Sequence, residues 1–285
     1  MQYKEDNHGK IYRLYDVKDT SSKSSQKGMC NKIECCMRSN GVLEHGLFKE
    51  RFREYSKDHI MEQFIYELSL IVGVPCCRAY CRQHDNVIGS FSRYEIPNNC
   101  DFIHLSDLMQ KSEVTADELL SRAINISGLS SNFVRDIYKD IIFDFLTGQH
   151  DRHLDNLAIM RNRSTKKVKL YPLYDNGICC FSHLERENAI ELLTQGFYSS
   201  CYGTSEDIIE AIVKYRESIF NADLALLVNY KALNIRLIEQ LLDKSSKYDK
   251  LGKQRTEEIA KFIMRQAYII DCINYRKEIP QYEDR

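Results

Sequence analysis

Residues 141–156 read IIFDFLTGQHDRHLDN, and residues 173–177 read LYDNG. The first stretch predicts an apolar helix that ends at Gly148 and a polar loop in which Asp151 and Asn156 are five residues apart. Strand-like residues 157–160 and 168–171 follow and predict a hairpin, with Asp175 just beyond its second strand. The sequence therefore places two carboxylates and an amide on short loops held by a helix and a hairpin.

These residue types suit phosphoryl transfer, which depends mainly on position and charge neutralisation. Protein-kinase loops use Asp-x-x-x-x-Asn, with a second metal-binding Asp on the next hairpin. Asp151 is accordingly expected to orient the acceptor hydroxyl and to take its proton. Asn156 and Asp175 are expected to hold Mg²⁺, a hard cation that takes few protein oxygens. The pattern therefore predicts a phosphoryl-transfer site.

Two other interpretations of the same residues remain open. Asp151, His153 and Asp155 could form an ordinary polar turn after a helix. His150, Asp151 and His153 also form a dense group of potential zinc ligands, although zinc sites usually place two histidines four residues apart on a helix. The complete arrangement of helix, loop and hairpin favours phosphoryl transfer over both.

Composition and charge narrow the class of protein. The chain has 285 residues, enough for one large or two modest domains, with 43% hydrophobic and 28% charged residues, as in globular proteins. The net charge of -1, from 40 basic and 41 acidic residues, gives no global reason to expect nucleic-acid or membrane binding. No apolar run approaches the roughly 18 residues of a membrane span, and the first residues lack a signal-peptide core, so a cytoplasmic protein is expected.

The cysteines predict no disulfide framework and no zinc site. The 11 cysteines include three adjacent pairs, at residues 35–36, 76–77 and 179–180, and none forms Cys-x-x-Cys. Adjacent cysteines are poorly placed to pair with each other or to share one tetrahedral zinc. Reduced, mostly buried thiols are therefore expected.

The order of predicted elements is strand-rich first and helical later. Strands are expected at 10–17, 30–37, 42–48, 77–82 and 87–94, with one helix at 57–72 and a mobile serine-rich segment at 20–28. After a linker at 97–99 the composition becomes helical, with helices expected at 116–127, 132–146, 207–220, 222–227, 234–242 and 256–273 and a solvated loop at 243–253. The expected fold class is α+β, with a strand-rich lobe over residues 1–97 and a mainly helical lobe over residues 98–285.

The motif resembles that of the HipA-like kinases, an atypical branch of the protein-kinase-like fold. Their catalytic segment follows an apolar helix with Gly-Asn-x-Asp-x-His-x-x-Asn, a hairpin and Pro-x-Tyr-Asp; here residues 148–156 read GQHDRHLDN and residues 172–175 read PLYD. Phosphoinositide kinases share the Asp-Arg-His-x-x-Asn loop, but the Tyr-Asp form of the second motif favours the HipA-like side. The resemblance implies a bilobal kinase, with lobes meeting near residue 97, that transfers the γ-phosphate of ATP to a protein Ser/Thr hydroxyl with Mg²⁺.

The resemblance also implies roles for individual residues. It makes Asp151 the catalytic base and Asn156 and Asp175 the metal ligands, and it puts His153 where conventional kinase loops carry a lysine near the transferred phosphate. The nucleotide lysine should come from the third strand, and its partner from the helix at 57–72. The nucleotide-binding residues implied in this way are Lys49 and Glu62, the hinge residues Arg93, Tyr94, Glu95 and Ile96, and Ser22 and Ser24 of the phosphate-covering segment.

The sequence departs from the family pattern in three places. Gln149 replaces the asparagine after the glycine, and segment 20–28 is poor in glycine, so its serines are also candidate autophosphorylation sites. The chain lacks room for the extra N-terminal subdomain of the toxin kinases, so a compact relative is expected. Toxin relatives pair with a DNA-binding antitoxin. The resemblance therefore leaves open an antitoxin-like or other protein partner, although the sequence shows no surface for one. A small-molecule or phosphoinositide-type kinase, and an inactive kinase-like binding module, stay open as alternatives.

Overall fold

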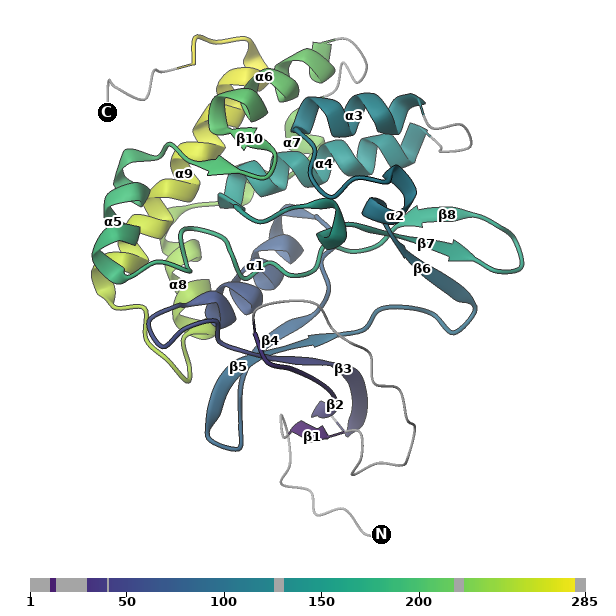
Figure 1. Ribbon diagram of the computed structural model, residues 1–285. Helices are drawn as coiled ribbons and strands as arrows, with labels where there is room; N and C mark the ends of the chain where they lie inside the picture. Colours follow the sequence, from purple (N-terminus) through teal and green to yellow (C-terminus); the bar gives the residue numbers. More distant parts are fainter. Residues whose placement is uncertain (1–10, 14–29, 40, 126–130, 218–222, 280–285) are drawn as a thin grey trace.

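A computed structural model of the chain describes residues 11–13, 30–39, 41–125, 131–217 and 223–279 (Figure 1). The serine-rich segment with Ser22 and Ser24 lies outside these residues. A five-stranded sheet lies at one end of the molecule and most of the helices at the other (Figure 1). No helix of the described ranges is both long and apolar enough to cross a bilayer.

The strand-rich part is one five-stranded antiparallel sheet. Its strands are β1 (Ile11–Arg13), β2 (Lys32–Ser39), β3 (Val42–Glu50), β4 (Ala79–His84) and β5 (Val87–Arg93), in the spatial order β1-β2-β3-β5-β4. Asp85 and Asn86 join β4 to β5 with φ of 48° and 67°, the conformation that tight hairpin turns require. Phe48 and Phe91 are buried in a small core of this sheet. The strand-like composition of these segments thus predicted the strands to within a few residues.

Helix α1 (Asp58–Val72) joins the sheet to the helical part. It ends at Gly73, whose φ of 75° is the left-handed conformation typical of a helix C-terminus. Ile60, Phe64 and Leu68 are buried and belong to the large core of the helical part, while the helix also packs against β4 and β5. Figure 1 shows α1 between the sheet and the helices. A residue on α1 can therefore face both parts.

Helix α4 (Ser131–Thr147) packs against α3 (Ala116–Asn125), α6 (Ser205–Tyr215) and α9 (Lys253–Tyr275). The apolar stripe predicted for α4 is completely buried, with Phe133, Ile137, Ile141 and Phe145 no more than 2% exposed. The other helical elements are α2 (Leu105–Met109), α5 (Arg186–Gln195), α7 (Leu224–Leu227), α8 (Ile235–Ser245) and the 3-10 turns η2 (Leu154–Asn156) and η4 (Tyr230–Ala232). A rigid, buried helix thus leads into the candidate catalytic loop.

The expectation of helical structure immediately after the linker at 97–99 is wrong. Residues Cys100–His104 form β6, which pairs with β7 (Ala158–Asn162), and β7 pairs with β8 (Val168–Leu170). The predicted hairpin is therefore part of a three-stranded sheet. Its third strand depends on a partner almost 60 residues away in the chain, and local composition carries no information about such a partner. The boundary between lobes near residue 97 stays a prediction.

Two further expectations need correction. Helix α5 was not predicted, because its charge-rich sequence buries only Ala189 and Leu193. The loop at 243–253 is not simply solvated, since Ser246 and Leu251 are buried. Asp249 in that loop forms ion pairs with Lys57, at 2.6 Å, and with His59, at 3.3 Å. The loop therefore packs against the start of α1.

The cysteines are as predicted. All 11 are free thiols and seven of them are buried.

Candidate active site

Gly148 turns the chain from α4 into the catalytic loop. Its φ is 57°, in the left-handed region, and a Cβ at this position would lie 2.8 Å from Cζ of Phe262 on α9. Both the backbone conformation and the available space therefore require glycine here. The loop then continues into η2, so that Asp151 and Asn156 are fixed at its two ends.

Asp151 lies at the open side of this loop. Its side chain is 50% exposed, and its backbone N–H donates to Oε1 of Gln149 at 3.1 Å. Partial burial raises the pKa of the Asp151 carboxyl, and the charge of nearby His153 opposes this rise. A raised pKa and an accessible carboxylate suit a general base. Gln149 thus keeps a hydrogen bond to the loop in place of the family's asparagine.

His153 and Asn156 close the loop on itself. Nδ2 of Asn156 donates to the backbone oxygen of Asp151 at 2.8 Å and lies 3.2 Å from Nε2 of His153. The imidazole of His153 lies 4.0 Å from Oδ1 of Asp151 and 3.6 Å from Oδ2 of Asp155. Both of these contacts use the side-chain nitrogen of Asn156, so its side-chain oxygen Oδ1 is the atom that could ligate a metal.

Asp175 reaches the same place from the other side. Its φ of 53° is unusual for a non-glycine residue, and Nε2 of Gln149 donates to its backbone oxygen at 3.4 Å. Oδ1 of Asp175 lies 2.5 Å from Nζ of Lys49, and Oδ2 lies 4.0 Å from Nζ of Lys32. Burial alone would raise the pKa of Asp175, but the two lysines outweigh burial and hold it at about 2. Asp175 is therefore an ionised oxygen donor.

Lys49 and Glu62 complete the group from β3 and α1. Nζ of Lys49 lies 3.9 Å from Oε1 of Glu62, whose Oε2 accepts from the backbone N–H of Asn176 at 3.1 Å. Burial raises the pKa of Glu62 to about 7 against the opposing charge of Lys49. Glu67 instead pairs with Lys244 at 2.8 Å. The charged segment around Lys49 could also have been a solvated surface, but the side chain of Lys49 is only 13% exposed.

Sequence reasoning missed Lys32. It lies directly opposite Lys49 in the β2–β3 pairing and places a second positive charge beside Asp175. Nothing in its local sequence distinguished it from other surface lysines, because its position depends on strand register.

Arg152 is the other residue that sequence reasoning missed. Its guanidinium is completely buried and donates to both carboxylate oxygens of Asp144, at 3.0 and 3.2 Å. It also donates to the backbone oxygen of Tyr174 and to Oδ1 of Asn176, both at 2.6 Å. Arg152 thus ties the catalytic loop to the segment that carries Asp175. The acidic Asp144 within an apolar helix was the available indication that a buried cation lay nearby.

Cys201 stands beside the candidate base. Its backbone N–H donates to the oxygen of His150 at 3.1 Å, and its sulfur lies 4.0 Å from Oδ1 of Asp151. Burial, followed by the charge of Asp151, raises the pKa of the Cys201 thiol to about 11. The neutral thiol therefore leaves Asp151 as the base of this pair.

Most backbone N–H groups of the predicted hinge residues already donate hydrogen bonds within the protein. The N–H groups of Arg93, Tyr94 and Glu95 donate to the oxygen of Arg78, the oxygen of His45 and the hydroxyl of Tyr171, at 2.8, 3.0 and 2.9 Å. Ile96 follows at the surface. An adenine base that used the Glu95 N–H would therefore have to replace the Tyr171 hydroxyl.

The zinc interpretation finds no support in the described part of the chain. No three or more His, Cys, Asp or Glu side chains gather there in a way that could hold a metal ion. The ring of His150 instead packs among Phe181, Tyr198 and His183, with ring centroids 4.5, 5.3 and 5.5 Å away.

This packing of His150 predicts a pH-dependent loss of stability. Both ring nitrogens are buried without a hydrogen-bond partner, and burial lowers the pKa of His150 to about 4. In the unfolded chain His150 takes up a proton near pH 6.5, whereas in the folded protein it does so only near pH 4. The contribution of neutral His150 to the free energy of unfolding is therefore complete above pH 6.5 and is lost as the pH falls towards 4. We expect the loss to be roughly 1–3 kcal/mol and to be absent in His150→Phe.

Urea unfolding of both proteins at a series of pH values checks this expectation. Equal losses of unfolding free energy between pH 7 and pH 4 in wild type and His150→Phe would contradict it.

Comparisons with known proteins identify the fold. No family model and no curated protein sequence matches the chain. Among solved structures, the chain is similar to the Helicobacter pylori proinflammatory kinase CtkA, with 13% identity over 90% of this chain and 94% of that one and a TM-score of 0.68. A Shewanella oneidensis MR-1 toxin–antitoxin complex of HipA, HipB and operator DNA is also similar, with 12% identity over 94% of this chain and 68% of that chain and a TM-score of 0.45. The first similarity confirms the expected α+β architecture, with a strand-rich part followed by a mainly helical part, and the chain shares its fold with the kinase CtkA.

Proposed function

We propose that the chain is an ATP- and Mg²⁺-dependent kinase that transfers the γ-phosphate of ATP to a protein Ser/Thr hydroxyl. One observation carries the proposal most strongly: Lys49 lies between Glu62 and Asp175, although the three residues come from β3, α1 and the turn after β8. Asp151 and Asn156 lie on the loop that Gln149 and Arg152 connect to the same turn. In our proposal, these residues supply a base, two metal ligands and a phosphate-binding cation to one site.

The available donors fit a magnesium ion. Asp175 supplies an ionised carboxylate and Asn156 an amide oxygen, and Mg²⁺ commonly takes only one or two protein oxygens, with phosphates and waters as its other ligands. When bound, the ion neutralises charge on the β- and γ-phosphates. In our proposal, Asn156 and Asp175 hold it.

The protein side chains would act as follows. Asp151 would orient the acceptor hydroxyl and accept its proton, for which its raised pKa is suitable. Lys49 and Lys32 would contact the nucleotide phosphates from the sheet. His153 would keep the loop in shape through its contacts with Asp151 and Asp155. Arg93, Tyr94, Glu95 and Ile96 remain the proposed adenine-facing segment, and Ser22 and Ser24 remain proposed phosphate contacts outside the described residues.

Incubation of the purified chain with γ-labelled ATP and Mg²⁺ tests the reaction and its acceptor. Label in protein bands, with candidate protein acceptors present, would support the proposed protein kinase. Label confined to an organic extract, with phosphoinositide vesicles present, would assign the lipid-kinase alternative instead. No loss of the γ-phosphate under either condition would contradict a kinase.

Replacing Lys49 by alanine is expected to lower kcat/KM for ATP by about 10- to 100-fold, because a charge-assisted contact with phosphate is lost. Lys32→Ala should lower it less, since Lys32 lies farther from Asp175. Steady-state kinetics with varied ATP measure both effects. Lys244→Ala is the matched control, because Lys244 pairs with Glu67 on α1 away from Lys49. A Lys49→Ala protein with the wild-type value would remove Lys49 from the proposed site.

A further inference from the structure

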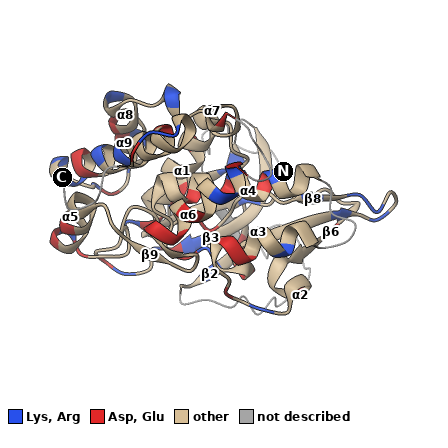
Figure 2. Cartoon of the chain, turned by 90° about the horizontal axis from the view of Figure 1, so that it is seen from above, with Lys and Arg blue, Asp and Glu red and all other residues tan. Residues whose placement is uncertain are grey.

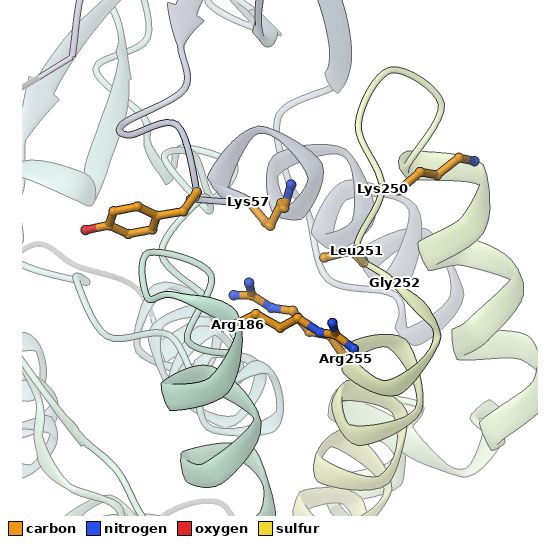
Figure 3. Close-up of a pocket in the computed structure, with 7 residues that line it drawn as sticks. Lys57, Arg186, Lys250, Leu251, Gly252 and Arg255 are labelled. Carbon is orange, nitrogen blue, oxygen red and sulfur yellow. The ribbon is translucent and has the colours of Figure 1, made fainter.

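A pocket of about 400 Å³ lies where α1, α5 and α9 begin (Figure 3). Its lining residues are Tyr55, Lys57, Arg186, Lys250, Leu251, Gly252 and Arg255. Four of the seven are basic and none is acidic, so we name it the cationic pocket. None of the residues proposed for phosphoryl transfer lines it.

Arg255 is the most unusual residue of the cationic pocket. It is only 1% exposed. Its terminal nitrogens donate to the backbone oxygens of Phe181, at 3.0 Å, and Leu184, at 3.5 Å, while its Nε is buried without a hydrogen-bond partner. Among the described residues no carboxylate forms an ion pair with it. The charge of Asp249, which pairs with Lys57, reaches Arg255 without forming an ion pair with it. A buried guanidinium without an ion-pair partner is costly, and a bound anion would relieve that cost.

Arg186 adds a second guanidinium to the same space. Figure 3 shows the side chains of Arg186 and Arg255 next to each other between the starts of α5 and α9. Burial, together with the positive charge of Arg186, lowers the pKa of Arg255 to about 10. Nη2 of Arg186 makes a 3.4 Å hydrogen bond to Gln254, but no carboxylate of the described ranges pairs with Arg186. The two side chains run past each other in opposite directions (Figure 3), and neither guanidinium forms an ion pair with a carboxylate of the described residues.

The helix starts around the cationic pocket add further positive potential. The N-cap residues of α1, α5 and α9 are Lys57, Glu185 and Gly252, and none makes a side-chain capping hydrogen bond. The free backbone N–H groups and the dipole at a helix start favour an anion. The first turns of α1 and α5 carry the acidic residues Asp58 and Glu187, whereas the first turn of α9 carries none, so the start of α9 adds the most positive potential beside the two guanidinium groups.

The other two cations contribute less. Lys57 is already paired with Asp249 at 2.6 Å, and the ammonium group of Lys250 points away from the two arginines (Figure 3). Basic and acidic residues alternate along α5, α8 and α9 (Figure 2), so this end of the molecule has no broad basic face. The unbalanced positive charge is therefore local, which favours a small anion over an extended polyanion.

We propose that the cationic pocket binds the dianionic phosphate group of a phosphate monoester or of inorganic phosphate. Arginine forks match phosphate oxygens in pairs, and the volume of the pocket can admit a phosphate group together with the side chain that carries it. The anion would lie between Arg186 and Arg255 and accept from the N–H groups at the helix starts.

The position of the cationic pocket suggests what such binding would hold together. Arg255 contacts the backbone of residues 181–184, and the N–H of Lys57 donates to the oxygen of Ser182 at 2.8 Å. These contacts join the start of α1 to the segment that follows Asp175. Any effect on catalysis rests on the proposed kinase function, whereas phosphate binding itself does not.

Calorimetric titration of the full chain, without nucleotide and at constant ionic strength, tests the proposal. The probes are inorganic phosphate, a phosphoserine peptide and the same peptide without phosphate. Wild type should bind the first two and not the third, and Arg186→Ala should weaken phosphate binding roughly tenfold. Lys250→Ala is the matched control, because it removes the same charge from a side chain that points away. Tighter binding of the phosphopeptide would identify a phosphorylated side chain as the source, and tighter binding of phosphate a free anion.

Two further variants make the outcome decisive. Arg255→Lys keeps the charge but loses the fork and should also weaken binding; if it fails to fold, the exposed Arg186 decides the test. Phosphate can also bind near Lys49, so the binding that depends on Arg186 must persist in Lys49→Ala. Wild-type affinity for phosphate in Arg186→Ala, or an equal loss in Lys250→Ala, would overturn the proposal without bearing on the kinase site.

Discussion

Replacing Asp151 by asparagine is expected to lower kcat for phosphoryl transfer by at least about a hundredfold, within the roughly 10²–10⁴-fold range of general-base catalysis. Asparagine has nearly the same shape but cannot take up the proton of the acceptor hydroxyl. The carboxylate of Asp151 is half exposed, and its nearest polar side-chain neighbours, His153 and Cys201, lie 4.0 Å away. The change should therefore leave the free energy of unfolding within about 0.5 kcal/mol of wild type.

The neighbouring Asp155 provides the control for this prediction. Its side chain is 54% exposed and accepts a hydrogen bond from Ser106 on α2 at 2.5 Å, so one of its carboxylate oxygens is already engaged. Asp155→Asn should keep kcat within about threefold of wild type while changing the loop charge equally. If Asp151→Asn retained full activity, or if both variants lost it equally, Asp151 could not be the base.

Replacing Arg152 by methionine is expected to destabilise the protein by about 3–5 kcal/mol, the usual effect of breaking a buried ion pair. The change would leave Asp144 without its cation in a site where burial already raises the pKa of that carboxyl. It would also remove the hydrogen bonds to Tyr174 and Asn176. The catalytic loop and the turn with Asp175 would then no longer share a rigid connection.

Urea unfolding followed by circular dichroism measures this effect, and Arg161→Met is the matched control. Arg161 pairs with Asp101 at the surface, where its side chain is 47% exposed, so its replacement should change the free energy of unfolding by less than about 1 kcal/mol. A similar small change for Arg152→Met would show that the buried network contributes little to stability.

The sequence predicts those parts of the fold that neighbouring residues in the chain determine. Helix α4 follows from its apolar stripe, the hairpin turn of β4 and β5 from Asp85 and Asn86, and the end of α1 from Gly73. The catalytic loop is predictable for the same reason, because the spacing of Asp151 and Asn156 is fixed within one short turn. Such features need no knowledge of the rest of the chain.

The parts that were missed depend on partners far apart in the sequence. Strand β6 needs β7, Arg152 needs Asn176, and Lys32 needs the β2–β3 register that brings it to Asp175. Strand register and helix packing decide these contacts, and composition records neither. The cationic pocket is a further example, since it combines the starts of three helices that are distant in sequence.

The choice between Glu62 and Glu67 shows how far a sequence can predict which side chain of a helix faces the sheet. Five residues of helix turn the side chain by about 140°, so only one of the two can face the sheet. The resemblance to HipA-like kinases implies Glu62, because its spacing to Gly73 fits their pattern better than that of Glu67, and the structure places Glu62 beside Lys49 and Glu67 beside Lys244. Position within a helix thus carried information here, while the role of Glu62 in catalysis stays a prediction.

The central claim is that Lys49, Asp151, Asn156 and Asp175 form one magnesium-dependent phosphoryl-transfer site. Its most direct test is the rate at which the purified chain removes the γ-phosphate from ATP, measured with Mg²⁺, with EDTA and with Asp175→Asn. We expect turnover by wild type only when Mg²⁺ is present, and a rate lower by at least about a hundredfold for Asp175→Asn. No turnover by wild type with any acceptor, or equal turnover by Asp175→Asn, would contradict it.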